Sequence, residues 1–312
     1  MMKACIDIGG TKVAVSLAAH EPRWRRSEPT AREGDDGALA RQVIRLVDEA
    51  CAEAGVDPRA VREAGVSSCG PFVIEDGLIA LAAPNICGGL AGPGRGLPND
   101  WTRAPLEAPL RARFAALRVE NDGVAALEAE RRWGALRGLD HCAYVTWSTG
   151  VGMGLCVDGR ILRGKNGNAG HGGHMFVSDD ATGALCGCGN YGDVEALVAG
   201  SAIGRRAAAS GHGWKDARGL FEAAEAGDAE ATAVVDEACR VLGRALYNTV
   251  ALLDLQAISL GGSVFWHHRD FLLPRLQAQV ADHLPPLTAG VRLLPAGLGE
   301  RVGDFAALAL VV

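Results

Sequence analysis

Residues 3–17 read KACIDIGGTKVAVSL, and this stretch decides the fold. The apolar runs on either side of Gly9-Gly10 predict two strands joined by a tight turn. From Ala143 the chain repeats the arrangement in AYVTWSTGVGMGLCVDGRIL, where Asp158-Gly159 predicts a hairpin. A further apolar run that ends in Gly261-Gly262 predicts another strand and glycine turn. The repetition indicates a duplicated fold whose halves face each other across a cleft.

Helical spacing alternates with these strands. Apolar residues recur every three or four positions from Leu39 to Ala54 and from Ala229 to Leu253, which predicts two amphipathic helices. Short buried strands are expected from Gly65 to Ser68 and from Leu117 to Glu120. The alternation predicts an α/β architecture. We interpret the short basic cluster from Arg23 to Arg26 as a solvated turn.

Composition narrows the classes of function. The chain has 312 residues, of which 48% are hydrophobic and 22% charged, as expected for two soluble domains. It has no apolar run of 18 residues and no secretory signal pattern, so we expect no membrane partner. The net charge of −6 argues against a nucleic-acid partner. Nine cysteines without a disulfide pattern indicate free thiols in a reducing, cytoplasmic compartment.

The glycine turns are candidate phosphate-binding sites. Backbone N–H groups in such turns suit phosphate oxygens, and Asp7 could hold Mg²⁺ through water. An ordinary β-hairpin is the alternative, because the GxxxxGK[ST] spacing is absent. Three such turns in one chain predict a nucleotide held between two domains. The candidate residues are Asp7, Gly9, Gly10, Thr11, Lys12, Ser148, Thr149, Gly150, Gly152, Gly261 and Gly262.

Glu120-Asn121-Asp122 places a carboxylate where a predicted strand passes into a helix. Open α/β sheets bind ligands at the carboxyl ends of their strands. An aspartate there could accept the proton of an attacking hydroxyl during phosphoryl transfer. Asp122 is therefore the candidate general base, and a helix cap is the alternative.

A cluster of metal-binding residue types follows in the chain. His171-Gly-Gly-His174 precedes Cys186-Gly-Cys188 and Asp193. One imidazole, two thiolates and a carboxylate could complete a tetrahedral zinc site. A disulfide between two cysteines one residue apart would be strained. Free thiols are the alternative, and a water or no ligand could stand in place of Asp193.

In this order, DIGGTK, END, STGVGMG, AGHGGHM and CGCGNYGDVEA resemble the ROK family of sugar kinases and sugar-responsive repressors. The resemblance covers essentially the whole chain. It implies membership of the actin-like ATPase superfamily, with two actin-like (ribonuclease H-like) domains and an interdomain cleft. The small domain would span residues 1–117 and be completed by a C-terminal helix at 303–312. The large domain would span residues 118–302 and contain a zinc-binding insertion.

The resemblance also implies roles for individual residues. Asp122 would take the proton from a sugar hydroxyl, while Asp7 to Lys12 and Ser148 to Gly152 would bind the phosphates of Mg²⁺·ATP. Gly261-Gly262 would lie beside the adenosine. The implied sugar-binding residues are Gly70, Asn85, Asn121, Asp122, His171, His174 and Glu195. The implied zinc ligands are His174, Cys186, Cys188 and Asp193.

Two residues depart from the family pattern. Asp193 stands where a third cysteine is usual, and a carboxylate is a harder zinc ligand. His171 stands where glucokinases of the family have glutamate and bacterial N-acetylmannosamine kinases often have histidine. Glutamate only accepts hydrogen bonds, whereas imidazole can also donate one to an acetamido carbonyl. This position leaves glucose specificity open, and tuning of the zinc-side packing is the alternative role of His171.

The leading expectation is an ATP-dependent, glucokinase- or hexokinase-like transfer of the γ-phosphoryl group to the C6 hydroxyl of an aldohexose. The alternatives are an N-acetylmannosamine kinase, a sugar-responsive regulator and a non-catalytic sugar-binding protein. Only six residues precede Asp7, which argues against a DNA-binding domain ahead of it. A homodimer is the family's habit.

Overall fold

The first predicted strand–turn–strand unit forms part of a five-stranded sheet in the computed structural model, which describes residues 1–92, 96–179 and 184–311. An antiparallel meander is followed by parallel strands beside β1, in the order β3-β2-β1-β4-β8. The strands are β1 (Lys3–Ile8), β2 (Lys12–Ala18), β3 (Pro22–Pro29), β4 (Glu63–Ser68) and β8 (Ala116–Asn121).

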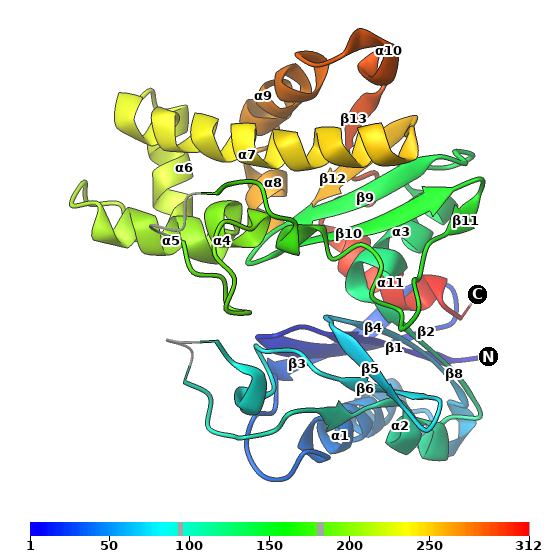
Figure 1. The fold of residues 1–312 in the computed structure, drawn as a ribbon. Helices are drawn as coiled ribbons and strands as arrows, with labels where there is room; N and C mark the ends of the chain where they lie inside the picture. The colour runs from blue at the N-terminus through cyan, green and yellow to red at the C-terminus, as the bar shows by residue number, and fades with distance from the viewer. Residues whose placement is uncertain (93–95, 180–183, 312) are drawn as a thin grey trace.

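The second unit forms a second five-stranded sheet with the same topology. Its order is β11-β10-β9-β12-β13, again an antiparallel meander followed by two parallel strands. The strands are β9 (Cys142–Trp147), β10 (Val151–Val157), β11 (Arg160–Ile161), β12 (Ala257–Gly261) and β13 (Arg292–Pro295). The matching orders confirm the duplicated α/β fold, and Figure 1 shows the two sheets in separate lobes.

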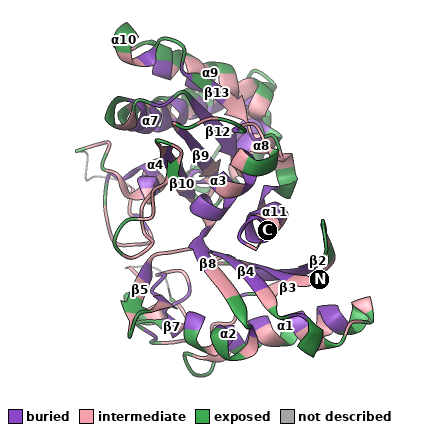
Figure 2. Ribbon diagram, turned by 90° about the vertical axis from the view of Figure 1, so that its right-hand side faces the viewer, coloured by how far each residue is buried: buried purple, intermediate pink, exposed green. Residues whose placement is uncertain are grey.

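Helices cover the outer face of each sheet, away from the other lobe (Figure 1). In the first lobe, α1 (Ala38–Ala54) buries the apolar face that its spacing predicts and ends at the left-handed Gly55, a common helix terminator. In the second lobe, α7 (Ala229–Leu253) begins where Asp228 accepts hydrogen bonds from two backbone N–H groups. Figure 2 shows the buried residues gathered in the strands and their facing helices.

The remaining elements join these layers. A small sheet beside the first lobe contains β5 (Phe72–Glu75), β6 (Leu78–Leu81) and β7 (Ala104–Pro105). The other helices are α2 (Glu107–Arg113), α3 (Asp122–Trp133), α4 (Val194–Val198), α5 (Gly200–Ala209), α6 (Ala217–Glu225), α8 (Ser263–His267), α9 (Arg269–Ala281), α10 (Pro285–Thr288) and α11 (Val302–Ala309). No helix of the described ranges combines the length and the apolar character needed to cross a membrane.

Two helices exchange between the lobes. After β8 of the first sheet, α3 packs against β9 and β10 of the second. After β13 of the second sheet, α11 packs against β1 and β4 of the first, and it also contacts α3 (Figure 1). The expected C-terminal helix therefore forms over Val302–Ala309, and Val312, the last residue of the expected range, lies outside the described residues.

The expected domain boundary at residues 117 and 118 falls inside β8, which pairs with β4 along its length. We propose that the boundary lies instead between Asn121 and Asp122, where the strand ends and α3 begins.

The predicted turn at Arg23 to Arg26 is wrong, because these residues lie in the edge strand β3. Its charged side chains face solvent and form ion pairs, as Arg25 does with Asp304 and Arg26 with Glu53. Charged residues are a common feature of exposed edge strands.

Candidate active site

Asp122 lies at the first position of α3, directly after β8. The residue that caps this helix is Asn121, whose side chain accepts a hydrogen bond from Gly123 N–H at 3.0 Å. Asp122 Oδ1 also accepts from Gly123 N–H, at 2.8 Å. The carboxylate nevertheless lines a cavity of about 440 Å³, so helix capping does not account for its position.

This cavity lies between the lobes and draws its walls from both. The first lobe contributes Asp7 and Lys12 from the first glycine turn. Gly262 comes from the glycine turn after β12. The other lining residues are Ser67, Ala126, Tyr144, Thr146, Ser263, Trp266, His267, Gly299, Glu300, Val302, Gly303 and Ala306.

The two aspartates of the cavity have raised pKa values. The pKa of Asp7 is raised to about 7, chiefly by burial and then by the Asp122 carboxylate, against the lowering effect of the Arg25 and Lys12 cations. Burial likewise raises the pKa of Asp122 to about 6, where the hydrogen bond from Gly123 N–H lowers it and the Glu195 carboxylate raises it. Two half-buried carboxylates, each with a neighbouring carboxylate that raises its pKa, form a setting that a divalent cation would stabilise. The residues therefore fit Mg²⁺.

Three expected sugar-binding residues meet beside the cavity. A Cβ atom built on Gly70 would lie 2.7 Å from His171 Nε2 and 3.4 Å from Asn121 Nδ2. A larger residue at position 70 would require the His171 ring to move. The segment before His171 is fixed to the first lobe, because the Asn168 side chain exchanges hydrogen bonds with the backbone of Phe72.

His171 has one ring nitrogen already engaged. Its Nδ1 lies 3.0 Å from the carbonyl oxygen of Asn168, which can only accept a hydrogen bond, so Nδ1 carries the proton. Burial lowers the pKa of His171, the Asn168 carbonyl raises it, and His174 lowers it. In the neutral ring Nε2 is then an acceptor, and this is the nitrogen that faces Gly70.

Asn85 lies against the first glycine turn. A Cβ atom on Gly10 would come within 2.0 Å of Asn85 Nδ2, so the turn and the side chain are in direct contact. Asn85 Oδ1 is buried without a hydrogen-bond partner in the protein. Buried polar atoms are normally paired, which marks this atom as a candidate ligand contact.

Glu195 connects the second glycine turn to a cluster of metal-binding residue types, called here the metal-type cluster: His174, Cys186, Cys188 and Asp193. Its Oε2 accepts from Val151 N–H at 3.0 Å and would lie 2.6 Å from a Cβ atom on Gly150. Its Oε1 lies 3.9 Å from Cys186 Sγ. Ser148 and Thr149 use their carbonyl groups to accept hydrogen bonds from the start of α5.

His174, Cys186, Cys188 and Asp193 converge, with one ligand atom from each within 4.8 Å of the others. His174 Nδ1 lies 3.2 Å from Asp193 Oδ2, 3.8 Å from Cys186 Sγ and 3.6 Å from Cys188 Sγ. Tetrahedral zinc with Zn–N near 2.0 Å and Zn–S near 2.3 Å places its ligand atoms about 3.3–3.8 Å apart. The four residues therefore fit zinc. The other oxygen of Asp193 accepts from Ala196 N–H at 2.7 Å and caps α4.

The predicted residues thus occupy two adjoining regions, the cavity between the lobes and the metal-type cluster. Of the predicted nucleotide-binding residues, Asp7, Lys12 and Gly262 line the cavity. Gly152 lies beside Asp122, since its Cβ atom would be 3.9 Å from Asp122 Oδ1. The residues outside the cavity lining are Gly9, Gly10, Thr11, Ser148, Thr149, Gly150 and Gly261.

Sequence reasoning missed the wall formed by Trp266, His267 and Glu300. The first two lie a few residues after the glycine turn at Gly261-Gly262, and this proximity was a usable signal. Glu300 carried no such signal, because it reaches the cavity from the short 3₁₀ helix Gly299–Arg301 that follows β13.

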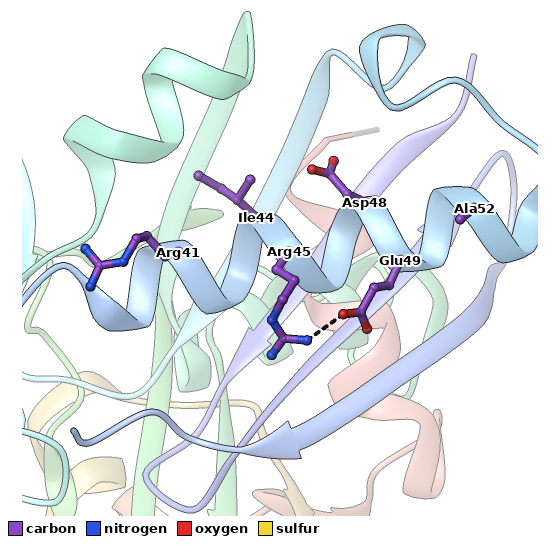
Figure 3. Close-up of a pocket in the computed structure, with 6 residues that line it drawn as sticks. All are labelled: Arg41, Ile44, Arg45, Asp48, Glu49 and Ala52. Atoms are coloured by element: carbon purple, nitrogen blue, oxygen red, sulfur yellow. Dashed lines mark hydrogen bonds and ion pairs between the residues drawn. The ribbon is translucent and has the colours of Figure 1, made fainter. Parts of the chain in front are cut away.

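A second hollow, of about 520 Å³, lies along the outer face of α1 (Figure 3). Its lining comes from this one helix, and the Arg45–Glu49 ion pair crosses it. Exposed pairs one helical turn apart are ordinary on a solvated face. This hollow lies on the far side of the first sheet from the cavity and is not a candidate active site.

Two lobes of the same topology, joined around a cavity with glycine turns and paired carboxylates, define a two-domain protein of the actin-like ATPase fold. The chain belongs to the ROK family, whose model matches residues 3–312.

Known proteins resemble the chain over most of its length. It is 30% identical to a glucokinase from Aeropyrum pernix, with 98% of this chain and 95% of that protein covered. It is 35% identical to an N-acetylmannosamine kinase from Salmonella typhi, with 85% and 84% covered. Among solved structures, the ROK hexokinase from Thermus thermophilus superposes with a TM-score of 0.77 at 31% identity, covering 99% of this chain and 98% of that one.

Proposed function

We propose that the protein is an ATP-dependent sugar kinase that transfers the γ-phosphoryl group to the C6 hydroxyl of an aldohexose, with Asp122 as the general base. The observation that carries the proposal is the position of Asp122. Its carboxylate lines the cavity between the lobes, and Gly70, Asn121 and His171 gather beside it. The similarity to kinases that act on sugars supports the same activity.

The chain's residues divide the work of the reaction. Asn121, Asn85 and His171 would orient the sugar, and Asp122 would accept the proton of the attacking hydroxyl. Lys12 and the glycine turns would hold the phosphates, and Asp7 would hold Mg²⁺. When bound, Mg²⁺·ATP supplies the phosphoryl group and charge neutralisation. Because phosphoryl transfer passes through a loose transition state, positioning and electrostatics account for most of the catalysis.

The residues His174, Cys186, Cys188 and Asp193 would hold zinc, and the metal would stabilise the segment that presents His174 beside His171. Their ring centroids are 6.2 Å apart, so both belong to the same wall. The metal's role in this proposal is structural.

The decisive variant is Asp122→Asn. The amide oxygen can still accept from Gly123 N–H, so the helix start is kept while the base is lost. We expect kcat to fall by about 10²–10⁴-fold, the usual contribution of a general base. Sugar binding by calorimetry should change little. The matched control is Asp158→Asn in the exposed β10–β11 hairpin, which should keep full activity. Turnover close to wild type in Asp122→Asn would refute the assignment.

A second candidate function is phosphorylation of N-acetylmannosamine, and His171 is compatible with it. The expected hydrogen bond from His171 to an acetamido carbonyl needs an N–H donor. The neutral ring has one N–H group, on Nδ1, and this group already donates to the carbonyl oxygen of Asn168. An accepting Nε2 suits either a sugar hydroxyl or an acetamido N–H. The sequence similarity of the chain to an N-acetylmannosamine kinase supports this alternative.

A coupled ADP-release assay distinguishes the candidates. It would compare glucose, mannose, N-acetylglucosamine and N-acetylmannosamine as acceptors for the wild-type protein. The highest kcat/KM on an unmodified hexose supports the first candidate, and the highest value on an N-acetylated sugar supports the second. ADP release that none of the sugars stimulates would overturn both. A regulatory role and a homodimer stay predictions.

A further inference from the structure

Glu130 is a fully buried carboxylate on α3, the helix that begins with Asp122. Its two oxygens accept four hydrogen bonds. Oε2 accepts from Ala135 N–H at 2.9 Å, from Gly297 N–H at 2.9 Å and from Ser259 Oγ–H at 3.1 Å. Oε1 accepts from Leu298 N–H at 2.9 Å. A buried carboxylate with this many donors is held firmly in one position.

The donors belong to segments that form the wall of the cavity. Gly297 and Leu298 directly precede Gly299 and Glu300, which line it. Ser259 lies on β12, which leads into the glycine turn at Gly262, another lining residue. Glu130 therefore ties the helix of the candidate base to the loop after β13 and to the strand before the third glycine turn.

The surroundings of Glu130 are packed too closely for residues larger than glycine at positions 134 and 297. A Cβ atom on Gly134 would lie 2.4 Å from Glu130 Cδ, and one on Gly297 would lie 2.5 Å from Ala135 N. The loop in turn touches the far side of the cavity, because a Cβ atom on Gly299 would lie 2.8 Å from Trp266 Cζ2. A shift of the loop would thus also displace the wall at Trp266.

We propose that Glu130 is a positioning residue for nucleotide binding: it fixes residues 296–300 and the third glycine turn in the arrangement that receives the nucleotide. The inference rests on the proposed kinase function. Glu130 acts through these segments and does not line the cavity itself. A carboxylate suits the role because it only accepts hydrogen bonds, whereas a glutamine amide would turn its own N–H donors toward one or more of the four donors.

The test compares Glu130→Gln with Glu107→Gln. Glu107 is also a buried carboxylate that accepts from a backbone N–H, that of Ile79, but it lies in the first lobe away from the cavity. Both variants should lower the melting temperature. Only Glu130→Gln should weaken binding of Mg²⁺·AMPPNP, measured by calorimetry, and raise KM for ATP, each by about tenfold. KM for the sugar should change less than about twofold.

Equal nucleotide affinities in the two variants, or an unchanged affinity in Glu130→Gln, would overturn the inference. If Glu130→Gln does not fold, Ser259→Ala removes one donor and should weaken AMPPNP binding in the same direction, and no weakening would overturn the inference. Calorimetry does not require turnover. A wild-type protein that binds AMPPNP without phosphorylating sugar would refute the proposed function alone, and one that binds no AMPPNP would refute both.

Discussion

The charge state of a single side chain, Asp122, governs the proposed chemistry. A general base must be a carboxylate when the substrate arrives, and it works best when its pKa lies near the working pH. Burial raises the pKa of Asp122 to about 6, and the nearby Glu195 carboxylate raises it as well. The site thereby makes the carboxylate a stronger base than a solvent-exposed aspartate, at the cost of protonation in mild acid.

This setting predicts an acid limb in the pH profile. Protonation of Asp122 removes the base, so kcat/KM should fall as the pH drops below about 6, with an apparent pKa well above the 3.8 of an ordinary aspartate. Glu195→Gln removes the neighbouring charge and should move the limb to lower pH. The amide oxygen of the variant can still accept from Val151 N–H, which keeps the local structure.

The measurement is kcat/KM from pH 5 to 8 at saturating ATP, with thermal unfolding followed at each pH to show that the protein stays folded. A limb near pH 4, or a limb at the same pH in Glu195→Gln, would contradict this account of the base.

Sequence reasoning reached some of these residues and not others, for a physical reason. Asp122, Asn121 and His171 could be proposed because each belongs to a short motif at the end of a strand or in a turn, and Gly70 only because of the family resemblance. Glu130 was missed because three of its four donors, on Ser259, Gly297 and Leu298, come from distant parts of the chain. Nothing in the spacing of α3 distinguishes a buried glutamate from an exposed one.

At the scale of elements, α4 depends on the same residue as the metal-type cluster. Asp193 uses one oxygen to cap α4 and the other to face His174 and Cys188. A cysteine at this position would offer a softer ligand but a poor helix cap. The carboxylate thus caps the helix and would also serve the proposed zinc site, which gives an aspartate at this position a structural use.

Removal of Asp193 should therefore have two separable effects. Asp193→Ala loses a helix cap and should lower the free energy of unfolding by about 1 kcal/mol for that reason alone. Asp216→Ala is the matched control, because Asp216 caps α6 by accepting from Gly219 N–H at 2.9 Å. We expect both variants to lose the cap contribution. Only Asp193→Ala should also lose zinc and show a raised KM for the sugar, because His174 is no longer held.

Elemental analysis of the purified variants checks the metal, and thermal unfolding with and without a chelator checks the stability. The wild type should contain about one zinc per chain and unfold at a lower temperature after chelation. Wild-type protein without zinc, or Asp193→Ala with the wild-type zinc content, would contradict the assignment.

For the whole molecule, the residue patterns predicted the duplication, whereas only the family resemblance implied that the C-terminal helix completes the first domain. Strand–turn–strand repeats are local patterns, so both meanders could be predicted from alternation and glycine turns. The helices α3 and α11 each follow the last strand of one sheet and pack against the other sheet. That choice depends on contacts between residues far apart in the chain, which periodicity does not encode.

A glycine lies at each place where one of these helices packs against the sheet of the other lobe. A Cβ atom on Gly123 of α3 would lie 2.4 Å from the carbonyl oxygen of Met153 in β10, and one on Gly65 of β4 would lie 2.0 Å from that of Ala307 in α11. Each helix therefore approaches its sheet at backbone contact distance. Because α11 also supplies Val302, Gly303 and Ala306 to the cavity, its seating on the first sheet sets the geometry of the site.

Gly65→Ala tests this seating. The added methyl group would meet a helix backbone that cannot move alone, so α11 must shift away from β4, and overpacking of this kind costs about 1–3 kcal/mol. We expect a lower melting temperature and a reduced kcat/KM, because the shift also moves Gly303, which lies near Asp7. Gly96→Ala is the matched control, since it adds the same methyl group in open space. If Gly65→Ala matched Gly96→Ala in stability and activity, the seating of α11 would not control the site.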